Sequence, residues 1–256
     1  MIKRALTKIK KFIIRQSVKS HEREFRHLKY YFSPYSKSRT LIVSFAAFPG
    51  KGNSAGYNYV ARLKGIKANK LFLLDDIWNP VNIGSYYLGK DGDWYLEKDV
   101  LDFLKQIEKQ YGFHNVIMIG SSKGGTSALY YGIKTEADYC IIGAPQYHVG
   151  QYLSSEHMQP VLKAVMGDNS QESINTLDRY IIEEMKKDHK KKPTVYVHYS
   201  PKEHTYKDHI KDMVCDLNEN GYRVIEDNDY DYEQHKDVAA YFPGYLIRVI
   251  KNIVAE

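Results

Sequence analysis

Short runs of aliphatic and β-branched residues alternate along this chain with longer segments whose apolar residues recur at helical spacing. Apolar runs of about four to eight residues, bounded by turn-forming residues, are typical of strands buried on both faces of a sheet. By this criterion, strands are predicted at residues 28–32, 40–45, 70–74, 115–119, 138–142, 194–199 and 222–225.

Helices are predicted for most of the segments between these strands. Val100, Leu101, Leu104 and Ile107 form one helical stripe within residues 97–111. Further helices are predicted after residue 122, at 209–218 and at 244–254, whereas residues 150–192 are helical and polar, without a core strand, as expected for a lid-like insertion. Strands separated by helices of this length favour a three-layer α/β fold, with a mostly parallel sheet and right-handed crossovers.

The positive charge of the chain is concentrated near its N-terminus. The net charge is +6, but residues 1–39 hold 12 Lys or Arg against 2 Glu, which leaves 25 basic and 29 acidic residues in 40–256. We therefore expect a basic, partly helical N-terminal extension (1–39) followed by the main domain (40–256). Within the extension, aliphatic residues recur at helical spacing, namely Ile2, Leu6, Ile9 and Ile13.

Two interpretations of this basic extension remain open. Residues 1–29 could contact an anionic membrane surface, where each basic residue adds about 1 kcal/mol of attraction. Alternatively, the aliphatic stripe packs on its own domain or on a second copy, and the oligomeric state is left open. Nucleic acid is not expected as a partner, because no helix-turn-helix, zinc or RNA-binding signature accompanies the charge.

The remaining composition favours a cytoplasmic protein, peripheral at the inner face of the membrane if the extension binds lipid. No stretch approaches the roughly 18–20 consecutive apolar residues of a membrane-spanning helix, and the start lacks the features of a signal peptide. Cys140 and Cys215 stand far apart, and they are expected to be reduced. No cofactor and no metal are expected.

A candidate nucleophile follows the predicted strand 115–119. Gly120-Ser121-Ser122-Lys123-Gly124 matches the G-x-S-x-G pattern between a buried strand and a helix. In this pattern the serine sits at a sharp strand-to-helix turn, the nucleophile elbow. The elbow needs small residues two positions before and after the nucleophile, and Gly120 and Gly124 satisfy this requirement. Ser122 would then stand at the carboxyl edge of the sheet, where the helix N-terminus favours developing negative charge. The alternative is a glycine-rich turn that exists for packing or binds a phosphate.

A base and an acid are expected further along the chain, because enzymes with a serine at this kind of elbow carry their catalytic residues in the order Ser, then Asp or Glu, then His. His235 follows the last predicted strand and precedes the closing helix, so it is the candidate base. Glu203 lies shortly after strand 194–199 and is the candidate acid that orients the imidazole, with Asp208 as the second choice.

An oxyanion hole requires two N–H donors aimed at one point. The backbone N–H of Lys123 is the expected first donor, and Ala47 or Phe48, in the loop after strand 40–45, is the expected second. The same loop runs into Gly50-Lys51-Gly52-Asn53-Ser54-Ala55-Gly56, with Asp75 after the next strand. This segment departs by one residue from a dinucleotide fingerprint, so a Rossmann-type nucleotide-binding enzyme is kept as a lesser alternative.

These motifs resemble those of the α/β-hydrolase superfamily. More narrowly, the chain resembles capsular-polysaccharide proteins of the XcbB/CpsF type and the accessory-secretion acetyltransferases that modify glycans. The resemblance rests on Phe48-Pro49-Gly50-Lys51-Gly52, Gly56-Tyr57-Asn58-Tyr59, Gly84-Ser85-Tyr86-Tyr87-Leu88-Gly89 and Gly120-Ser121-Ser122-Lys123-Gly124-Gly125.

The resemblance implies an α/β-hydrolase fold and a serine esterase or O-acyltransferase that acts on a surface polysaccharide or its precursor. The Ser, Glu, His order of the acetyltransferases falls on Ser122, Glu203 and His235. The implied partners are an acylated carbohydrate, or an acyl donor together with a glycan acceptor. The alternative from another class is a non-catalytic partner in a glycan-assembly or secretion complex.

Aromatic residues between strand 70–74 and the next helix are candidates for sugar binding. The chain has 23 tyrosines, whose flat faces and polar tips suit hydroxyl-rich ligands. The segment after strand 70–74 starts at the carboxyl edge of the sheet, where ligands gather. Tyr86, Tyr87, Trp94 and Tyr95 are therefore the expected substrate-binding residues. The alternative is that these rings only cover the sheet edge.

Overall fold

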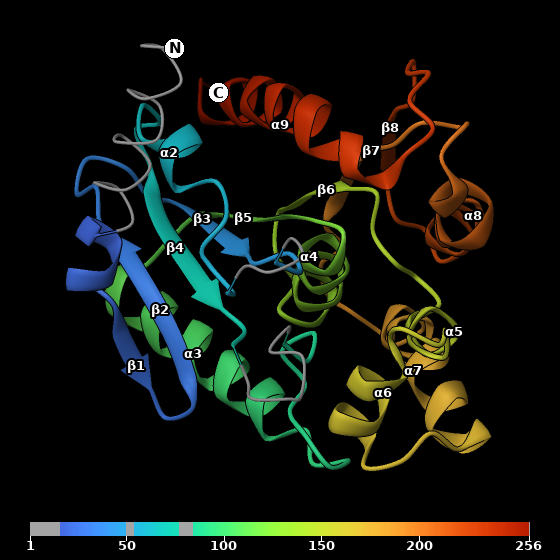
Figure 1. Cartoon of the computed structure of the whole chain (residues 1–256). Helices are drawn as coiled ribbons and strands as arrows, with labels where there is room; N and C mark the ends of the chain where they lie inside the picture. Colours follow the sequence, from blue (N-terminus) through green and yellow to red (C-terminus); the bar gives the residue numbers. More distant parts are fainter. Residues whose placement is uncertain (1–15, 50–53, 77–83, 256) are drawn as a thin grey trace, which may run out of the picture.

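A mixed sheet runs through the centre of the molecule (Figure 1). The computed structural model describes residues 16–49, 54–76 and 84–255, and within these residues the sheet has eight strands. In sheet order they are β1 (Arg23–Phe25), β2 (Leu28–Ser33), β4 (Asn69–Leu74), β3 (Thr40–Phe45), β5 (Asn115–Ser121), β6 (Tyr139–Gly143), β7 (Thr194–His198) and β8 (Val224–Asp227). The strands from β4 to β8 are parallel, whereas β1 and β2 are antiparallel to their neighbours. Each predicted strand is present, and the short β1 was not predicted.

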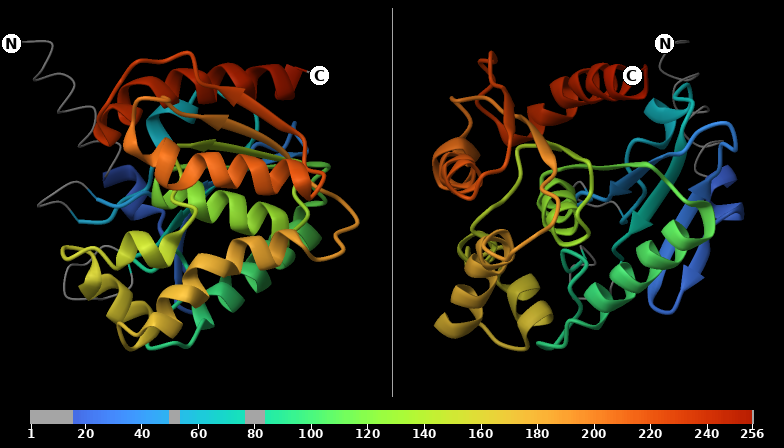
Figure 2. Two further views of the ribbon diagram at one scale, coloured as in Figure 1. Left: turned by 90° about the vertical axis from the view of Figure 1, so that its right-hand side faces the viewer. Right: turned by 180° about the vertical axis from the view of Figure 1, so that it is seen from behind.

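Helices cover both faces of the sheet (Figure 2). One face carries α2 (Val60–Leu63) and α9 (Val238–Ala255), and the other carries α3 (Tyr95–Tyr111) and α4 (Lys123–Lys134). Beside β8 lies α8 (Lys211–Glu219), preceded by the π-helical turn η1 (Tyr206–Ile210), and the 3-10 turn η2 (His235–Asp237) leads into α9. The predicted three-layer α/β fold is confirmed.

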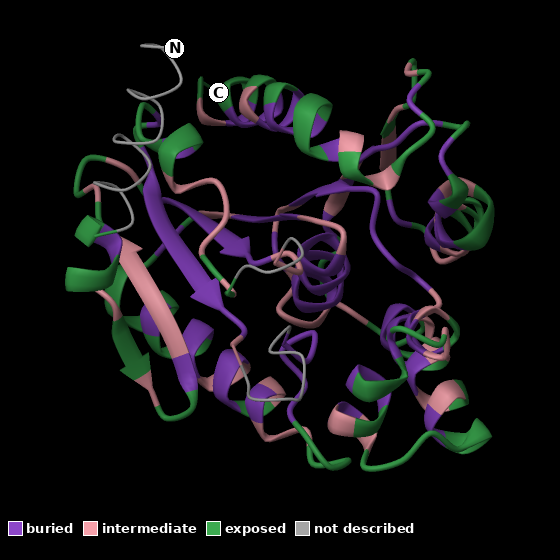
Figure 3. Cartoon of the chain, in the orientation of Figure 1, coloured by how far each residue is buried: buried purple, intermediate pink, exposed green. Residues whose placement is uncertain are grey.

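The central strands and α4 form the core. β3 and β4 are buried at every position, as expected for apolar runs covered on both faces (Figure 3). α4 is buried from its first residue to Ile133, because it lies between the sheet and α7. Both cysteines are free thiols, as expected. Cys140 is fully buried in this core, and burial raises the pKa of its thiol, whereas Cys215 is exposed.

The segment between β6 and β7 is helical and has no strand, as its pattern predicts. It forms α5 (Val149–Leu153), α6 (Gln159–Met166) and α7 (Gln171–Met185), which pack on one another. Ser170 caps α7 by accepting a hydrogen bond from the backbone N–H of Ser173. α7 also contacts α4, which anchors the insertion to the core. A role as a lid stays a prediction.

Part of the expected N-terminal extension belongs to the sheet. β1 pairs with β2, and β2 pairs with β4, from Lys29 opposite Leu74 to Ser33 opposite Lys70. The sheet therefore begins at Arg23 and continues across the boundary expected after residue 39. Residues 1–15, which include the aliphatic stripe of the basic segment, lie outside the described residues.

The closing helix is longer than the predicted 244–254. His235–Ala255 has a mean hydropathy of 1.2 and is long and apolar enough to cross a membrane by length and composition alone. In this structure α9 packs on β6 and α2, burying Phe242, Leu246 and Ile250 while Arg248 and Lys251 remain at the surface. The buried apolar face of this helix therefore belongs to the core of the domain, whereas Tyr241 on the other side is exposed.

Candidate active site

Ser122 sits in a strained turn between β5 and α4. Its backbone has φ 52° and ψ −130°, a conformation that L-residues rarely adopt. A Cβ on Gly120 would lie 2.1 Å from the carbonyl oxygen of Gly124, and a Cβ on Gly124 would lie 2.5 Å from that of Phe45. Both neighbours must therefore be glycine, as the elbow pattern requires.

Three predicted residues from distant parts of the chain meet at the carboxyl ends of the parallel strands. Ser122 Oγ lies 2.9 Å from Nε2 of His235, and Nδ1 of His235 lies 3.2 Å from Oε1 of Glu203. Ser122 follows β5, Glu203 follows β7, and His235 follows β8. The structure thus brings the predicted nucleophile, base and acid into one hydrogen-bonded line.

Glu203 is the carboxylate that faces the histidine. Its side chain is fully buried, and it accepts hydrogen bonds from His235 and from the Thr205 hydroxyl. Burial alone would raise the pKa of Glu203, but these hydrogen bonds outweigh burial and hold the pKa below its usual value. Asp208, the second choice, lies 3.2 Å from Nδ1 of His204 instead. His204 also approaches Glu203, with Nε2 at 3.4 Å from Oε1.

The loops that carry Glu203 and His235 are tied together at the ends of β7 and β8. The fully buried His198 holds Asp227 through its Nδ1 at 2.6 Å. The Ser200 hydroxyl donates to the carbonyl oxygen of Tyr230 at 2.9 Å, which joins the two loops directly. Burial lowers the pKa of His198 despite the nearby carboxylate. The hydrophobic pattern contained no signal for this pair of a buried histidine and a partly buried aspartate.

The expected oxyanion donors differ in whether their backbone N–H already has a hydrogen-bond partner. The backbone N–H of Lys123 opens α4 directly after Ser122, where helix N–H groups have no partner within the helix. The N–H of Ala47 already donates to Oδ1 of Asn58 at 3.1 Å, so Ala47 would have to release Asn58 to serve an oxyanion. Phe48 follows Ala47, and its ring lies edge-on to Tyr86 at 5.5 Å.

The side chain of Lys123 forms a fully buried ion pair with Asp75. Nζ lies 2.7 Å from Oδ2 of Asp75, and neither side chain is exposed to solvent. Burial lowers the pKa of Lys123 more than Asp75 raises it. Asp75 also accepts hydrogen bonds from the backbone N–H groups of Ser85 and Tyr87. Asp75, the acidic residue of the near-fingerprint for dinucleotide binding, therefore joins the elbow to the loop after β4. Residues 50–53 of that motif lie outside the described residues.

Tyr86 and Tyr87 do not offer faces to a ligand. They are 1% and 0% exposed, so the expectation that they stack on sugar rings is wrong. The hydroxyl of Tyr87 donates to the carbonyl oxygen of Leu73 and accepts from the N–H of Ala46. Both rings lie inside because the chain from Gly84 onward packs tightly against Asp75.

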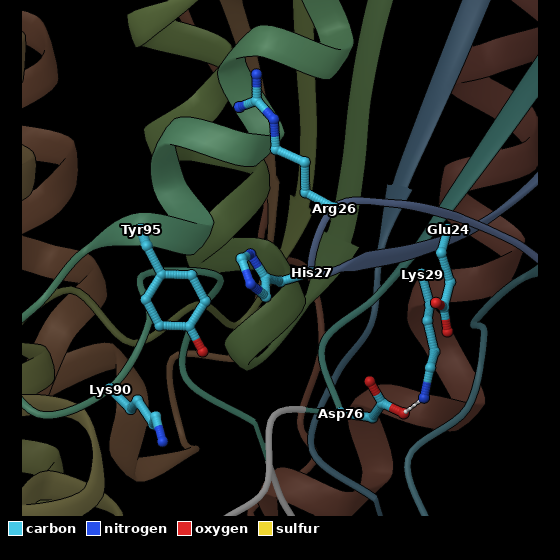
Figure 4. Close-up of a pocket in the computed structure, with 7 residues that line it drawn as sticks. All are labelled: Glu24, Arg26, His27, Lys29, Asp76, Lys90 and Tyr95. Carbon is cyan, nitrogen blue, oxygen red and sulfur yellow. Dashed lines mark hydrogen bonds and ion pairs between the residues drawn. The ribbon is translucent and has the colours of Figure 1, made fainter.

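Trp94 and Tyr95 make their contacts elsewhere, with residues other than Ser122, Glu203 and His235. The half-buried Trp94 packs edge-on against Tyr180 at 5.8 Å. Tyr95 lines a pocket beside the β1–β2 turn (Figure 4). Lys29 and Asp76 also line this pocket and form an ion pair at 2.6 Å. Ser122, Glu203 and His235 do not border this pocket.

Among the described residues, no His, Cys, Asp and Glu side chains cluster to hold a metal.

Gln146 is a site residue that the sequence analysis missed. Its Nε2 donates to Oγ of Ser122 at 2.8 Å, and the residue is only 1% exposed. Gln146 follows β6, the strand beside β5, so it reaches the same sheet edge as Ser122. A polar residue three positions after the end of a buried parallel strand was the available signal.

The sheet, its helices and a serine at the strand–turn–helix elbow define the α/β-hydrolase fold. The chain belongs to the family described as "Accessory Sec system GspB-transporter", whose sequence profile matches residues 3–256. A curated relative, an accessory Sec system protein of Staphylococcus aureus, is 30% identical over 164 residues. The alignment covers 59% of this chain and 29% of that relative, so the aligned part spans less than a third of the relative's length.

Solved structures share this fold at low sequence identity. A variant of the capsule O-acetyltransferase of Neisseria meningitidis serogroup A, in complex with CoA, has a TM-score of 0.75 at 20% identity, covering 90% of this chain and 94% of that chain. The glycosylation associate protein (Gap123) complex of Streptococcus agalactiae gives 0.71 at 19%, covering 88% and 44%. Mouse α/β hydrolase domain-containing protein 10 gives 0.59 at 13%, covering 91% and 97%. The resemblance to α/β hydrolases and accessory-secretion proteins is confirmed.

Proposed function

We propose that this chain is a serine-dependent O-acyltransferase that moves an acyl group, with acetyl as the first choice, from a donor to a carbohydrate hydroxyl. The observation that carries the proposal is the line from Ser122 Oγ through His235 to the buried Glu203, with distances of 2.9 and 3.2 Å. A serine becomes a useful nucleophile only when a base takes its proton, and this line supplies that base and its orienting acid.

The proposed reaction has two steps, and His235 carries the proton in both. Oγ of Ser122 attacks the donor carbonyl and forms the acyl–Oγ bond as its proton passes to Nε2 of His235, and the bond between the acyl carbon and the leaving group then breaks as the leaving group takes that proton. The acceptor hydroxyl then gives its proton to His235 and attacks the acyl carbon, and Oγ regains the proton as it leaves. Glu203 holds Nδ1–H of His235 and stabilises the imidazolium that forms in each step.

The donor we propose is an acyl thioester of the acetyl-CoA type. The support is the shared fold with a capsule O-acetyltransferase variant whose structure contains CoA. The step balances without another reactant: acetyl-S-CoA and a sugar hydroxyl yield an acetyl ester and the free thiol. Carbohydrate as the acceptor rests on the same similarity and on the family's link to accessory secretion.

Two measurements test this proposal. The wild type should react with a fluorophosphonate probe at Ser122, and acetyl-CoA should leave an acetyl group on the same residue in an intact-mass experiment. Ser122→Ala should abolish both signals while changing the melting temperature little, because the hydroxyl contributes little packing. Ser121→Ala is the neighbouring control, and we expect it to retain labelling. Full labelling of Ser122→Ala would reject the assignment.

A non-catalytic role in a protein complex is the second candidate. It is favoured by the similarity to part of the Gap123 complex and by membership in the accessory Sec family. If wild-type protein neither labels nor becomes acetylated, yet binds other accessory Sec proteins, this candidate replaces the first.

A further inference from the structure

We propose that Gln146 is a catalytic residue that stabilises charge on Oγ of Ser122, and that Tyr86 is the positioning residue that orients the amide of Gln146. The inference rests on the proposed function, because it assigns a role in the same serine chemistry. It also gives the buried Tyr86 a place in the site.

The backbone of Gln146 is fixed to the helix that begins at the elbow. Its N–H donates to Oγ1 of Thr126 at 2.9 Å, and the Thr126 hydroxyl donates to its carbonyl oxygen at 2.7 Å. Thr126 lies in the first turn of α4, four residues after Ser122. The Gln146 side chain thus starts from a point that cannot move independently of the nucleophile.

The hydrogen-bond donors and acceptors around Ser122 determine which end of the Gln146 amide faces Oγ. A carboxylate only accepts, so the contact between Nδ1 of His235 and Glu203 favours the neutral tautomer with its proton on Nδ1, and in that tautomer Nε2 accepts the proton of Oγ. A serine hydroxyl has one proton, and therefore its second partner must be a donor. The amide nitrogen of Gln146 meets this requirement at 2.8 Å.

Tyr86 holds the other end of the amide. Its hydroxyl donates to Oε1 of Gln146 across 3.5 Å, a long hydrogen bond between buried groups. A donor facing the amide oxygen and an acceptor facing the amide nitrogen specify the same orientation of the group. A flipped amide would place its oxygen, an acceptor, against Oγ, where it would compete with His235 for the serine proton.

The amide of Gln146 is already in contact with Oγ when negative charge develops on that atom. As His235 removes the serine proton, negative charge develops on Oγ, and a donor already in place stabilises it without reorganisation. The same contact assists the second step, when the acyl–Oγ bond breaks and negative charge develops on Oγ as the proton returns from His235. The amide hydrogens are not transferred. Gln146 comes from β6, whereas the loop with Ala47 follows β3 on the opposite side of β5, so Gln146 serves Oγ and not the acyl oxygen.

Fluorophosphonate labelling tests this role because it reports the reactivity of Oγ without any acceptor sugar. Gln146→Leu keeps most of the volume and removes the donor, so the second-order labelling rate should fall about 10- to 100-fold. Gln146→Glu keeps the acceptor for Tyr86 but places an acceptor against Oγ, and it should be at least as slow. Gln151→Leu, an exposed glutamine in α5, is the matched control and should label at the wild-type rate.

A double-mutant cycle tests the role of Tyr86. Tyr86→Phe removes only the hydroxyl and should slow labelling in the wild-type background, but it should have no further effect in Gln146→Leu. With acetyl-CoA, both single variants should lower kcat and leave KM near the wild-type value, because the contact is made to the nucleophile and not to the donor. Rates are compared well below each melting temperature, so that loss of fold is not read as loss of reactivity.

The outcomes separate this inference from the proposed function. A wild type that does not label at Ser122 rejects the proposed function itself. A wild type that labels while Gln146→Leu or Gln146→Glu labels equally fast overturns the role of Gln146. If Tyr86→Phe slows labelling equally in both backgrounds, Tyr86 does not act through Gln146.

Discussion

His209 is a buried histidine that its surroundings keep neutral. It is 3% exposed, and the backbone N–H of His148 donates to its Nδ1 at 3.3 Å. Burial, together with the neighbouring His148, lowers the pKa of His209 to about 4, although Asp208 acts in the opposite direction. The unfolded chain would bind a proton near pH 6.5. Folding is therefore coupled to deprotonation of this residue.

The sign of the resulting pH dependence follows from the depressed pKa. Between about pH 4 and 6.5 the unfolded state binds more protons, so the contribution of His209 is complete above this range and is lost as pH falls through it. We expect wild-type protein to lose about 2 kcal/mol of unfolding free energy between pH 7 and 5 through this residue. His209→Asn retains an acceptor and should flatten that part of the curve in urea titrations. The exposed His157→Asn should not, and equal curves for wild type and His209→Asn would contradict the assignment.

At the scale of elements, the nucleophile turn and the loop after β4 are joined by the Asp75–Lys123 pair. Nζ of Lys123 also lies 4.8 Å from the ring centre of Tyr87 and 5.6 Å from that of Phe48. Gly84 has φ +86°, and a Cβ there would lie 2.6 Å from Asp75, so this loop closes tightly on the carboxylate. The pair therefore holds three segments in one arrangement: the elbow, the loop after β3 and the loop after β4.

Removing one partner of this pair should be costly. Asp75→Asn leaves the Lys123 charge buried and uncompensated, for which we expect a loss of about 3–5 kcal/mol in unfolding free energy. Asp75→Asn combined with Lys123→Met should recover a large part of that loss, because no charge remains buried. The exposed Lys98→Met, which breaks an ion pair with Asp102, is the control and should change stability little. If the double variant is no more stable than Asp75→Asn, the buried charge is not the cause.

At the scale of the whole molecule, the basic charge lies at one end of the chain and the hydrogen-bonded line at the carboxyl edge of the sheet. The structure limits how much of the N-terminal region can be removed. β1 and β2 complete the sheet beside β4, and Arg26 in their turn contacts Asp99 and Asp102. Residues 16–39 are therefore part of the domain, and the proposal of a membrane contact is best tested on residues 1–15.

Truncation should separate these two parts. Deleting residues 1–15 removes six Lys or Arg and no described strand. We expect unchanged melting and unchanged Ser122 labelling, with weaker binding to anionic vesicles at low salt, since each basic residue contributes about 1 kcal/mol. Deleting residues 1–34 also removes β1 and β2, exposes the edge of β4 and should lower the melting temperature. If full-length protein does not bind anionic vesicles, the membrane contact fails, and packing on the domain or on a second copy replaces it.

Local patterns in the chain predicted the strands and the elbow, and the order of residues after those strands selected Ser122, Glu203 and His235, which the structure brings within hydrogen-bonding distance. Burial on both faces makes a strand continuously apolar, and a sharp strand-to-helix turn needs glycine at fixed offsets, so both features can be recognised within a few residues. The serine, acid and base follow strands whose carboxyl ends share one edge, so their order along the chain also carried information.

Contacts between distant residues required the tertiary structure. Tyr86 and Tyr87 have the composition of a sugar-binding surface, but the backbone N–H groups of Ser85 and Tyr87 bind Asp75, and both rings are buried. Gln146 belongs to the site because β6 lies next to β5, and Asp75 pairs with Lys123 because their two segments meet above the sheet. Sequence spacing determines which face of an element a side chain occupies. The side chain it meets there depends on strand order and loop path, which are set by packing of the whole domain.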